Sequence, residues 1–384
     1  MGFQLSRRYT TIALGIGSSL LMTGCSANPF ARWFSPITSP PTPESPSEDL
    51  SFIDISLEQV NPQGEKIWEL EALKVTYQDE TQLAVLEKPS GVLFQGGEAT
   101  YRVSGDTGTV NEAVSELTLE GNVVLELLTE EGQVEGAKLT WQPNEAFFLL
   151  EGNLKGHYQA VNFSGQRAEL RNREQQLLLS DTVVADLPTS QVRLRTEALT
   201  WDIAEKVVQG IVPVVLEHYG KENPEQIIDR ATGDGIRADL TKQHFSLSPN
   251  AMVKLGKSQL EIRSKALLWD TIAAVIRSDT PITITTADRS QIRGNTGEFA
   301  LNTQIATLVG AIQAQHQNPL GNLWADRVQW QLENDRIEAV GAVRYEQPSS
   351  GLKMEGTQAI GNLGSQEIEV TGSQQVKTVY VLPE

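Results

Sequence analysis

Apolar and polar residues alternate with a period of two along most of the chain. Before Gly121, Leu117 and Leu119 alternate with Thr and Glu. After it, Leu125 and Leu127 continue the same spacing. This pattern is typical of a β-hairpin with one buried face and its turn at the glycine. No stretch beyond residue 50 sustains helical spacing over three turns, so we expect little helix.

The hairpin pattern recurs at a nearly fixed interval. Successive turn residues lie 31, 29, 29, 39, 30, 31, 31 and 31 residues apart. They are Gly121, Gly152, Asp181, Gly210, Pro249, Asp279, Gly310, Gly341 and Gly372. The one long interval contains a polar insertion at residues 219–229. A fixed period between about 20 and 50 residues is the signature of stacked repeats, so the sequence predicts a repetitive β architecture.

Aromatic residues add a second pattern with twice this period. Trp141, Trp201, Trp269 and Trp330 lie 60, 68 and 61 residues apart, and Tyr77 continues the series backward. We interpret these side chains as a packing ladder inside the sheets. Stacking against a ligand is the alternative interpretation.

Together these patterns predict an all-β protein in which each repeat adds one strand to each of two facing antiparallel sheets. The apolar faces of the two sheets must meet in order to leave water. They could pack flush, or they could splay apart and leave an apolar trough. The terminal strands would be open edges, which favour strand addition by another chain.

The charge balance excludes several partners. The 384 residues include 49 acidic and 31 basic side chains, which gives a net charge of −18. Phosphate backbones and anionic membranes attract basic surfaces, so we expect no nucleic acid and no charge-driven membrane adhesion. Only 6 % of the residues are aromatic, which suits a thin β core.

The sequence offers no candidate catalytic or metal site. His157 and His218 keep the same place in successive repeats, which differs from metal-ligand spacing. The Asp-Thr-Gly triplet at 106–108 matches an aspartic-protease signature, but it returns at 295–297 as Asn-Thr-Gly without the acid. The chain contains no P-loop and no nucleophile-elbow motif. We therefore expect no enzyme activity, no metal and no cofactor.

Residues 1–25 have the features of a bacterial signal peptide. Arg7 and Arg8 precede an apolar run at residues 10–22, which is short for a membrane span. The run ends in Leu-Met-Thr-Gly before Cys25, the single cysteine, and this resembles a lipobox. We expect Cys25 to carry lipid as the first mature residue; an uncleaved anchor helix is the alternative. Residues 26–50 contain six prolines and are expected to form a linker.

A series of short motifs follows in residues 52–128. They are Gly64–Ala72 (Gly-Glu-Lys-Ile-Trp-Glu-Leu-Glu-Ala), Tyr77, Leu86–Pro89, Gly105–Gly108 and Leu119–Val123. Behind an anchor and a linker, this order resembles the LptC family, the periplasmic component attached to the ABC transporter that exports lipopolysaccharide. The later repeats resemble LptA- and OstA-like proteins of the same pathway. The chain departs from the family's short members in its greater length and its lipobox.

The resemblance implies an elongated, incomplete β-jellyroll of two splayed antiparallel sheets. An LptC-like part would occupy residues 51–187, and an LptA/OstA-like part would continue through residues 188–384. Acyl chains of lipopolysaccharide, or of a similar envelope lipid, would lie in the apolar trough. The lipid-binding side chains expected from the period-2 pattern are Leu83, Val85, Val92, Phe94, Leu117, Leu119, Leu125 and Leu127.

The resemblance also implies partners and a location. Inner-membrane transporter subunits like LptF and LptG would supply the lipid to this periplasmic, inner-membrane-anchored protein. A partner like LptA or LptD would receive it at the C-terminal strand near residues 376–382. The alternative is a periplasmic or surface β-solenoid lipoprotein that acts as a scaffold or glycan-binding module. An interior without large plugs favours the conduit, whereas a core filled with aromatic side chains favours the scaffold.

Overall fold

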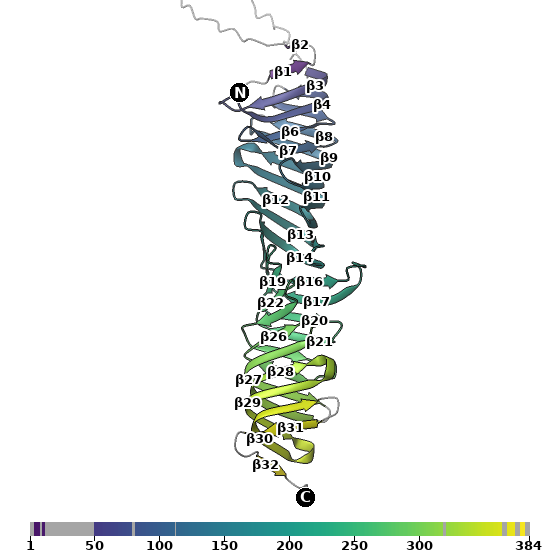
Figure 1. The fold of residues 1–384 in the computed structure, drawn as a ribbon. Coiled ribbons are helices and arrows are strands. Elements are labelled where there is room, and N and C mark those ends of the chain that lie inside the picture. Colours follow the sequence, from purple (N-terminus) through teal and green to yellow (C-terminus); the bar gives the residue numbers. More distant parts are fainter. Residues whose placement is uncertain are drawn as a thin grey trace, which may run out of the picture. The chain divides into compact units, whose positions relative to one another are not determined.

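The structure, a computed structural model, describes residues 4–7, 10–11, 50–78, 81–111, 113–317, 320–362, 367–372 and 377–380, with side chains within residues 50–372 of these ranges. Most of the described residues lie in β-strands (Figure 1). The chain forms two compact units. The first comprises residues 1–130 and 137–145, and the second comprises residues 131–136 and 146–384.

Strands of the first unit run from the N-terminus to β9. They are β1 (Gln4–Arg7), β2 (Thr10–Thr11), β3 (Leu50–Val60), β4 (Lys66–Gln78), β5 (Leu83–Glu87), β6 (Ser90–Gln95), β7 (Glu98–Ser104), β8 (Thr107–Asn111) and β9 (Glu116–Leu127). Strand β10 (Gly132–Gln142) contributes residues to both units and is followed by the 3-10 helix η1 (Pro143–Glu145).

The second unit contains the remaining strands and two further 3-10 turns, η2 (Leu332–Asn334) and η3 (Pro348–Ser350). Its strands are β11 (Phe147–Tyr158), β12 (Val161–Arg171), β13 (Gln176–Leu187), β14 (Val192–Asp202), β15 (Val207–Gly210), β16 (Val214–Tyr219), β17 (Ile227–Gly233), β18 (Ile236–Asp239), β19 (His244–Leu247), β20 (Ala251–Leu255), β21 (Leu260–Ser264), β22 (Leu267–Asp270), β23 (Val275–Ser278), β24 (Ile282–Thr285), β25 (Gln291–Gly294), β26 (Thr296–Ala300), β27 (Ile305–Gln317), β28 (Leu320–Gln331), β29 (Arg336–Gln347), β30 (Leu352–Asn362), β31 (Glu367–Thr371) and β32 (Lys377–Tyr380).

Each repeat of the first unit contributes to two sheets. Residues 116–120 of β9 pair with β8, whereas residues 124–127 of the same strand pair with β7. From β8 the pairing continues through β5 to one half of β4, and from β7 it continues through β6 to the other half of β4. Two antiparallel sheets therefore face each other, joined by the strands that run through both.

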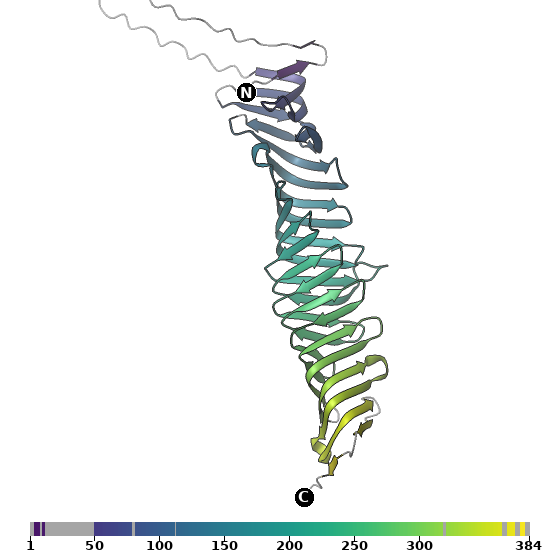
Figure 2. The same ribbon diagram turned by 60° about the vertical axis from the view of Figure 1, so that its left-hand side comes forward.

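The second unit follows the same rule through more strands (Figure 2). One sheet, called sheet 1 here, pairs β14, β15, β18, β19, β22, β23 and β26 in that order. The other, sheet 2, pairs β14, β16, β17, β20, β21, β24 and β25. Strands β27 to β30 again run through both sheets. This confirms the all-β fold of two antiparallel sheets built from repeats.

The predicted hairpin turns at residues 121, 152, 181, 310 and 341 are bends inside strands, so the hairpin interpretation was wrong there. At residues 210, 249 and 279 a short strand of sheet 1 ends and the next strand begins in sheet 2. Gly121 and Gly152 lie within β9 and β11, and each is followed by an asparagine that also has a positive φ. Two successive residues in the left-handed region also make a type I′ hairpin turn. Here, however, the segments on the two sides pair with different strands, and the chain passes from one sheet to the other.

Polar side chains from the neighbouring repeat contact these bends. Asp106 accepts a hydrogen bond from Asn122 at 2.7 Å and pairs with the Lys88 ammonium at 2.6 Å. These contacts, Lys88 first, hold the pKa of the Asp106 carboxyl below its usual range. The second unit repeats the arrangement, because Asp326 accepts the Ala342 N–H at 3.1 Å. The Asp-Thr-Gly triplet is thus part of a bend.

The actual chain reversals lie at the ends of the strands. The predicted insertion at residues 219–229 contains the loop between β16 and β17, residues 220–226 (Figure 1), which is closed by a hydrogen bond from the Gly220 N–H to the Gln226 carbonyl at 3.0 Å. Across the Pro188 turn, Leu187 of β13 pairs with Val192 of β14. The sheet therefore runs through the expected boundary at 187/188 without a break, and a division into LptC-like and LptA-like parts there stays a prediction.

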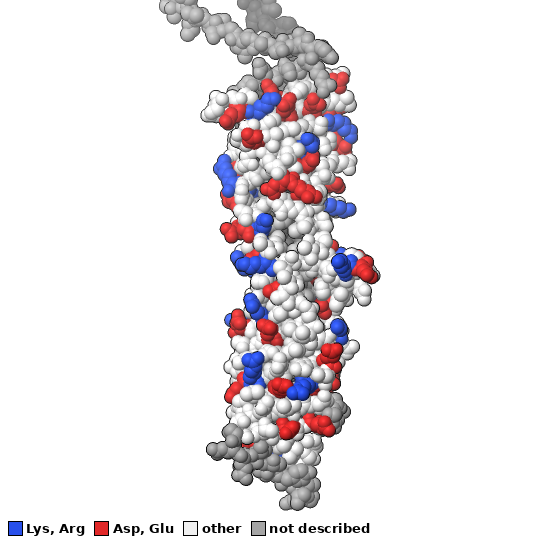
Figure 3. All heavy atoms as spheres, in the orientation of Figure 1, with Lys and Arg blue, Asp and Glu red and all other residues white. Residues whose placement is uncertain are grey.

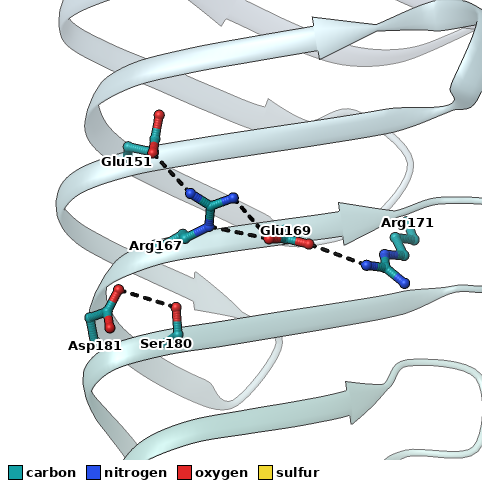
Figure 4. A network of polar contacts seen from close by, with 6 residues as sticks. All are labelled: Glu151, Arg167, Glu169, Arg171, Ser180 and Asp181. Atoms are coloured by element: carbon teal, nitrogen blue, oxygen red, sulfur yellow. Dashed lines mark hydrogen bonds and ion pairs between the residues drawn. The ribbon is translucent and has the colours of Figure 1, made fainter.

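Charged side chains occupy the outer faces of the sheets. Acidic and basic residues are interspersed over the face shown in Figure 3. On β12, Arg167 contacts Glu151 of β11 at 3.2 Å and Glu169 at 3.0 Å, and Glu169 also contacts Arg171 (Figure 4). All these groups are partly exposed, so each pair contributes about 0–1 kcal/mol and marks the solvent side of the sheet.

A glycine pair tests the bend. Gly97 and Gly121 both have positive φ, at 82° and 75°. A Cβ at Gly97 has open space, whereas a Cβ at Gly121 lies 2.7 Å from an Asp106 carboxylate oxygen. We expect Gly97→Ala to cost about 1–2 kcal/mol of unfolding free energy through backbone strain alone. Gly121→Ala should cost about 1 kcal/mol more because it displaces Asp106 from its hydrogen bonds. Urea denaturation measures both, and equal losses would contradict the packing role of the bend.

Candidate functional site

The interior of the second unit is lined on sheet 1 by one uninterrupted row of cross-strand neighbours. We call it the tryptophan row: Trp201, Val208, Ala238, Phe245, Trp269, Ile276, Phe299, Ala306 and Trp330. All nine side chains are buried. The tryptophans stand four strands apart with smaller residues between them, so the ladder is a mixed row in which tryptophan does not stack on tryptophan. This arrangement fits the predicted packing role.

An opposing row on sheet 2 completes the interior. This aliphatic row consists of Leu194, Leu216, Ala231, Val253, Ile262, Ile284 and Ile292. Its central members, such as Ile262 and Ile284, have exposed fractions of 0 %. The inner faces therefore touch in the middle of the unit, and an incoming chain has to displace these contacts to pass.

Aromatic pairs close the side of the interior opposite the bends. Tyr158 at the end of β11 meets Trp201 edge-to-face, with 5.4 Å between ring centroids. His218 at the end of β16 meets Trp269 in the same way at 5.7 Å. The His218 ring is held by Asp229 at 2.9 Å, whose other oxygen accepts the Gly256 N–H. Edge-to-face pairs contribute about 0.5–1.5 kcal/mol beyond burial. The two pairs therefore stabilise the contact between the sheets at this side of the interior.

The interior opens near the C-terminal end of the second unit. A cavity of about 380 Å³ lies between strands β25 to β31 of the two sheets. Its apolar wall includes Ile292, Leu323, Trp330, Ile337, Leu352 and Met354. Polar side chains such as Gln315, His316 and Asn362 also border it. The volume lies within the range of about 300–1,000 Å³ that is usual for small-molecule sites, and we call it the C-terminal cavity.

Three of the eight expected lipid-binding residues point into the first unit. Leu117, Leu119 and Leu125 have exposed fractions of 1 %, 0 % and 2 %. Leu127 is half-buried and pairs with the buried Tyr101 on the same inward row. The structure thus brings these four leucines of β9 together on the interior face. Whether lipid contacts them is a separate proposal.

The facing of the other four was predicted one residue out of register. Val85 is exposed, whereas its neighbours Ala84 and Leu86 are buried at 3 % and 0 %. Leu83 shares the register of Val85, as the pairings of β5 with β8 show. A signal in the sequence was missed: Glu87 has to face water, and Val85, two residues before it, lies on the same face.

The same slip affects β6. Leu93 is fully buried, while Val92 and Phe94 on either side of it are half-buried. Val92 pairs with Arg102, which is exposed and reaches Glu126 on the outer face. Because residues 92–94 are all apolar, alternation alone could not set the register of this strand.

One buried titratable group, Tyr219, belongs to a polar cluster at the ends of neighbouring strands. Burial, together with a 2.6 Å hydrogen bond to Asp186, raises the pKa of Tyr219 to about 12. Asp186 also pairs with Arg193, so the cluster is a structural contact between neighbouring strands. Among the described side chains, no three His, Cys, Asp or Glu residues are close enough to hold a metal ion. Two expected sites, Cys25 and residues 376–382, lie outside the described side chains.

Thiol accessibility tests the corrected register. On a Cys25→Ser background, we expect Val85→Cys to react with a maleimide as an exposed thiol. Ala84→Cys should react at least about tenfold more slowly, because the thiol becomes accessible only when the strand opens. Both changes introduce the same group on one strand, which makes them matched controls. Faster labelling at position 84 than at position 85 would show that Val85 faces inward, as the sequence pattern predicted.

Comparison with known proteins bears on the first unit. Residues 20–149 match a family model described as "Lipopolysaccharide-assembly, LptC-related". A search of curated proteins finds no match. Among solved structures, the chain is similar to LptH of Pseudomonas aeruginosa, titled the LptA homologous periplasmic component of the lipopolysaccharide transport device. The identity is 15 %, the TM-score is 0.30, and the match covers 33 % of this chain and 97 % of that chain. Residues 20–149, about a third of the chain, are therefore similar to the LptC-related family of lipopolysaccharide-assembly proteins.

Proposed function

We propose that the protein is a lipid bridge of the cell envelope. It receives lipopolysaccharide, or a similar envelope lipid, from an inner-membrane ABC transporter and passes it toward the outer membrane between its two sheets. The observation that carries this proposal is the pair of continuous apolar rows on facing sheets. The LptC-related match of residues 20–149 supports lipopolysaccharide transport in general, and the direction and the individual steps belong to the proposal.

Continuous rows suit a sliding lipid. Each row presents an apolar side chain on every successive strand, so an acyl chain that advances along the interior exchanges one apolar contact for another. Burying a methylene group contributes about 0.8 kcal/mol wherever it lies on such a surface. The interior can therefore retain a chain without fixing its position. Net movement has to be driven from outside, which fits a transporter as the source.

The partners follow from the same proposal. Subunits like LptF and LptG would load the lipid, and a protein like LptA or LptD would extend the sheets at the C-terminal end. Strand β32 pairs with β30 on one side only among the described strands, which leaves its other edge for strand addition. The protein would act in the periplasm, held at the inner membrane by its N-terminus. In the described part of the chain, no helix has the length and apolar character needed to cross a membrane.

A scaffold is the second candidate, and one observation favours it. Large aromatic side chains fill the middle of the second unit, where Phe245, Trp269 and Phe299 are buried at 1–2 % exposure. Such filling was expected of a scaffold core and not of an open trough. A conduit requires the sheets to separate there during passage, whereas a scaffold does not.

Photo-crosslinking in cells distinguishes the two candidates. A crosslinking amino acid at Leu119 or Leu125, which point inward, should capture lipid from the living envelope. The same group at Thr118 or Glu126, the adjacent outward positions, should not. Lipid adducts at the inward pair alone support the conduit. Equal yields at all four positions, or no adducts while the protein is folded and expressed, would leave the scaffold as the function.

The proposed anchor has its own test. If Cys25 is the lipidated first residue, mass spectrometry of the mature protein should show a chain that begins at Cys25 and carries acyl groups. Cys25→Ser should release the protein from membranes without changing its unfolding midpoint. An unmodified Cys25 with residues 1–24 still attached would point to an anchor helix instead.

A further inference from the structure

Two aromatic closures of the second unit obey one geometric rule. Counted along paired strands, Tyr158 lies three strands before Trp201, on the facing sheet. His218 likewise lies three strands before Trp269. Tyr158 follows the inward Gly156 by two residues, and His218 follows the inward Leu216 by two residues. Cross-strand pairing places both rings in one row, at the side of the interior away from the bends. Each tryptophan is thus covered by a ring supplied from three strands earlier.

The rule fails at the third tryptophan. Three strands before Trp330 is strand β24, and the equivalent position is Thr286, two residues beyond the inward Ile284. Threonine cannot supply a ring. Among the described side chains, no aromatic ring lies against Trp330 in the way that Tyr158 and His218 lie against their partners. The C-terminal cavity borders Trp330.

We propose that the C-terminal cavity is a binding site for one uncharged alkyl or acyl chain, and that Tyr158 and His218 are covers that close two equivalent sites. The chain packs on Trp330 where the earlier repeats place their own rings. This inference rests on the proposed lipid function and locates one lipid contact within the second unit. The sites at Trp201 and Trp269 are closed, and the site at Trp330 is open.

The lining of the cavity selects the chemistry of its ligand. Leu323, Ile337 and Met354 offer apolar surface, and small residues such as Ala314 and Gly361 leave the space between the sheets. Among the described side chains, no Lys or Arg borders the cavity, whereas Glu367 does. A buried anionic group would therefore meet a carboxylate and no described Lys or Arg, which disfavours it. The site takes the hydrocarbon part of a lipid and leaves any phosphate-bearing headgroup outside.

Titration with octyl glucoside below its micelle concentration tests the site in the purified full-length protein. This probe has one eight-carbon chain and no charge. We expect one saturable site by calorimetry, no binding of methyl glucoside, and weaker binding of octyl sulfate. Thr286→Tyr should abolish the site by supplying the missing ring. Thr285→Tyr places the same ring at the adjacent outward position and should leave binding unchanged. Equal binding by both variants would overturn the proposal.

A gain of binding provides the second arm and does not depend on Thr286. A cavity of about 20 Å³ already borders Trp201, lined by Phe163, Leu199 and other apolar residues. Removing the cover with Tyr158→Thr should enlarge it and raise the number of octyl glucoside molecules bound from one to two. Tyr158→Phe keeps the ring and should stay at one. An unchanged number in folded Tyr158→Thr would show that Tyr158 does not close a site.

The outcomes separate this inference from the proposed function. If Leu119 crosslinks lipid in cells while Thr286→Tyr and Thr285→Tyr bind octyl glucoside equally, the conduit stands and the C-terminal site is refuted. If the site binds as described while Leu119 captures no lipid, the site stands and the transport function is refuted.

Discussion

The passage of single strands through two sheets is the constraint on which the structure depends. A strand that bends at Gly121 or Gly310 pairs its two halves with different neighbours, so neither sheet can form without the other. The apolar faces of both are then buried in one step, and the hydrogen bonds of the backbone are satisfied on both sides of the bend. Positive φ at the bend and an acidic or amide side chain beside it are the local conditions for this. Outer-face ion pairs contribute little by comparison, since they remain in water.

From this constraint follows the tension between packing and passage. Two rows that meet at full burial stabilise the second unit, yet a lipid chain needs the same surfaces. Where Ile262 and Ile284 lie, the interior resembles an ordinary core; where Trp330 and Met354 lie, it resembles a ligand site. The difference arises from a few residues at the open side, while the backbone pattern stays the same. A binding region can thus be placed within a stacked-repeat protein by the choice of covering side chains alone.

The sequence revealed the strand content, the repeat, the two facing sheets and the inward face of β9, because strict alternation and a fixed period encode them directly. It misled where alternation fails. Residues 83–86 and 92–94 are apolar on both faces, so the pattern allowed either register, and only the charged Glu87 and Arg102 could have decided it. Glycine-asparagine pairs are equally suited to a hairpin and to a bend, since both need positive φ. No sequence pattern predicted the C-terminal cavity, because we attribute it to the absence of an aromatic ring at Thr286, opposite Trp330.

The alternation of strand direction has a consequence for how such a chain changes length. Trp201, Trp269 and Trp330 all lie on repeats that run from sheet 2 to sheet 1, and the repeats between them run the other way. Insertion of a single repeat would reverse every repeat that follows it and would move the next tryptophan to the wrong sheet. Duplication or loss in evolution is therefore expected in pairs of repeats, in steps like the 60 to 68 residues between tryptophans. The number of repeats would then change only in steps of two.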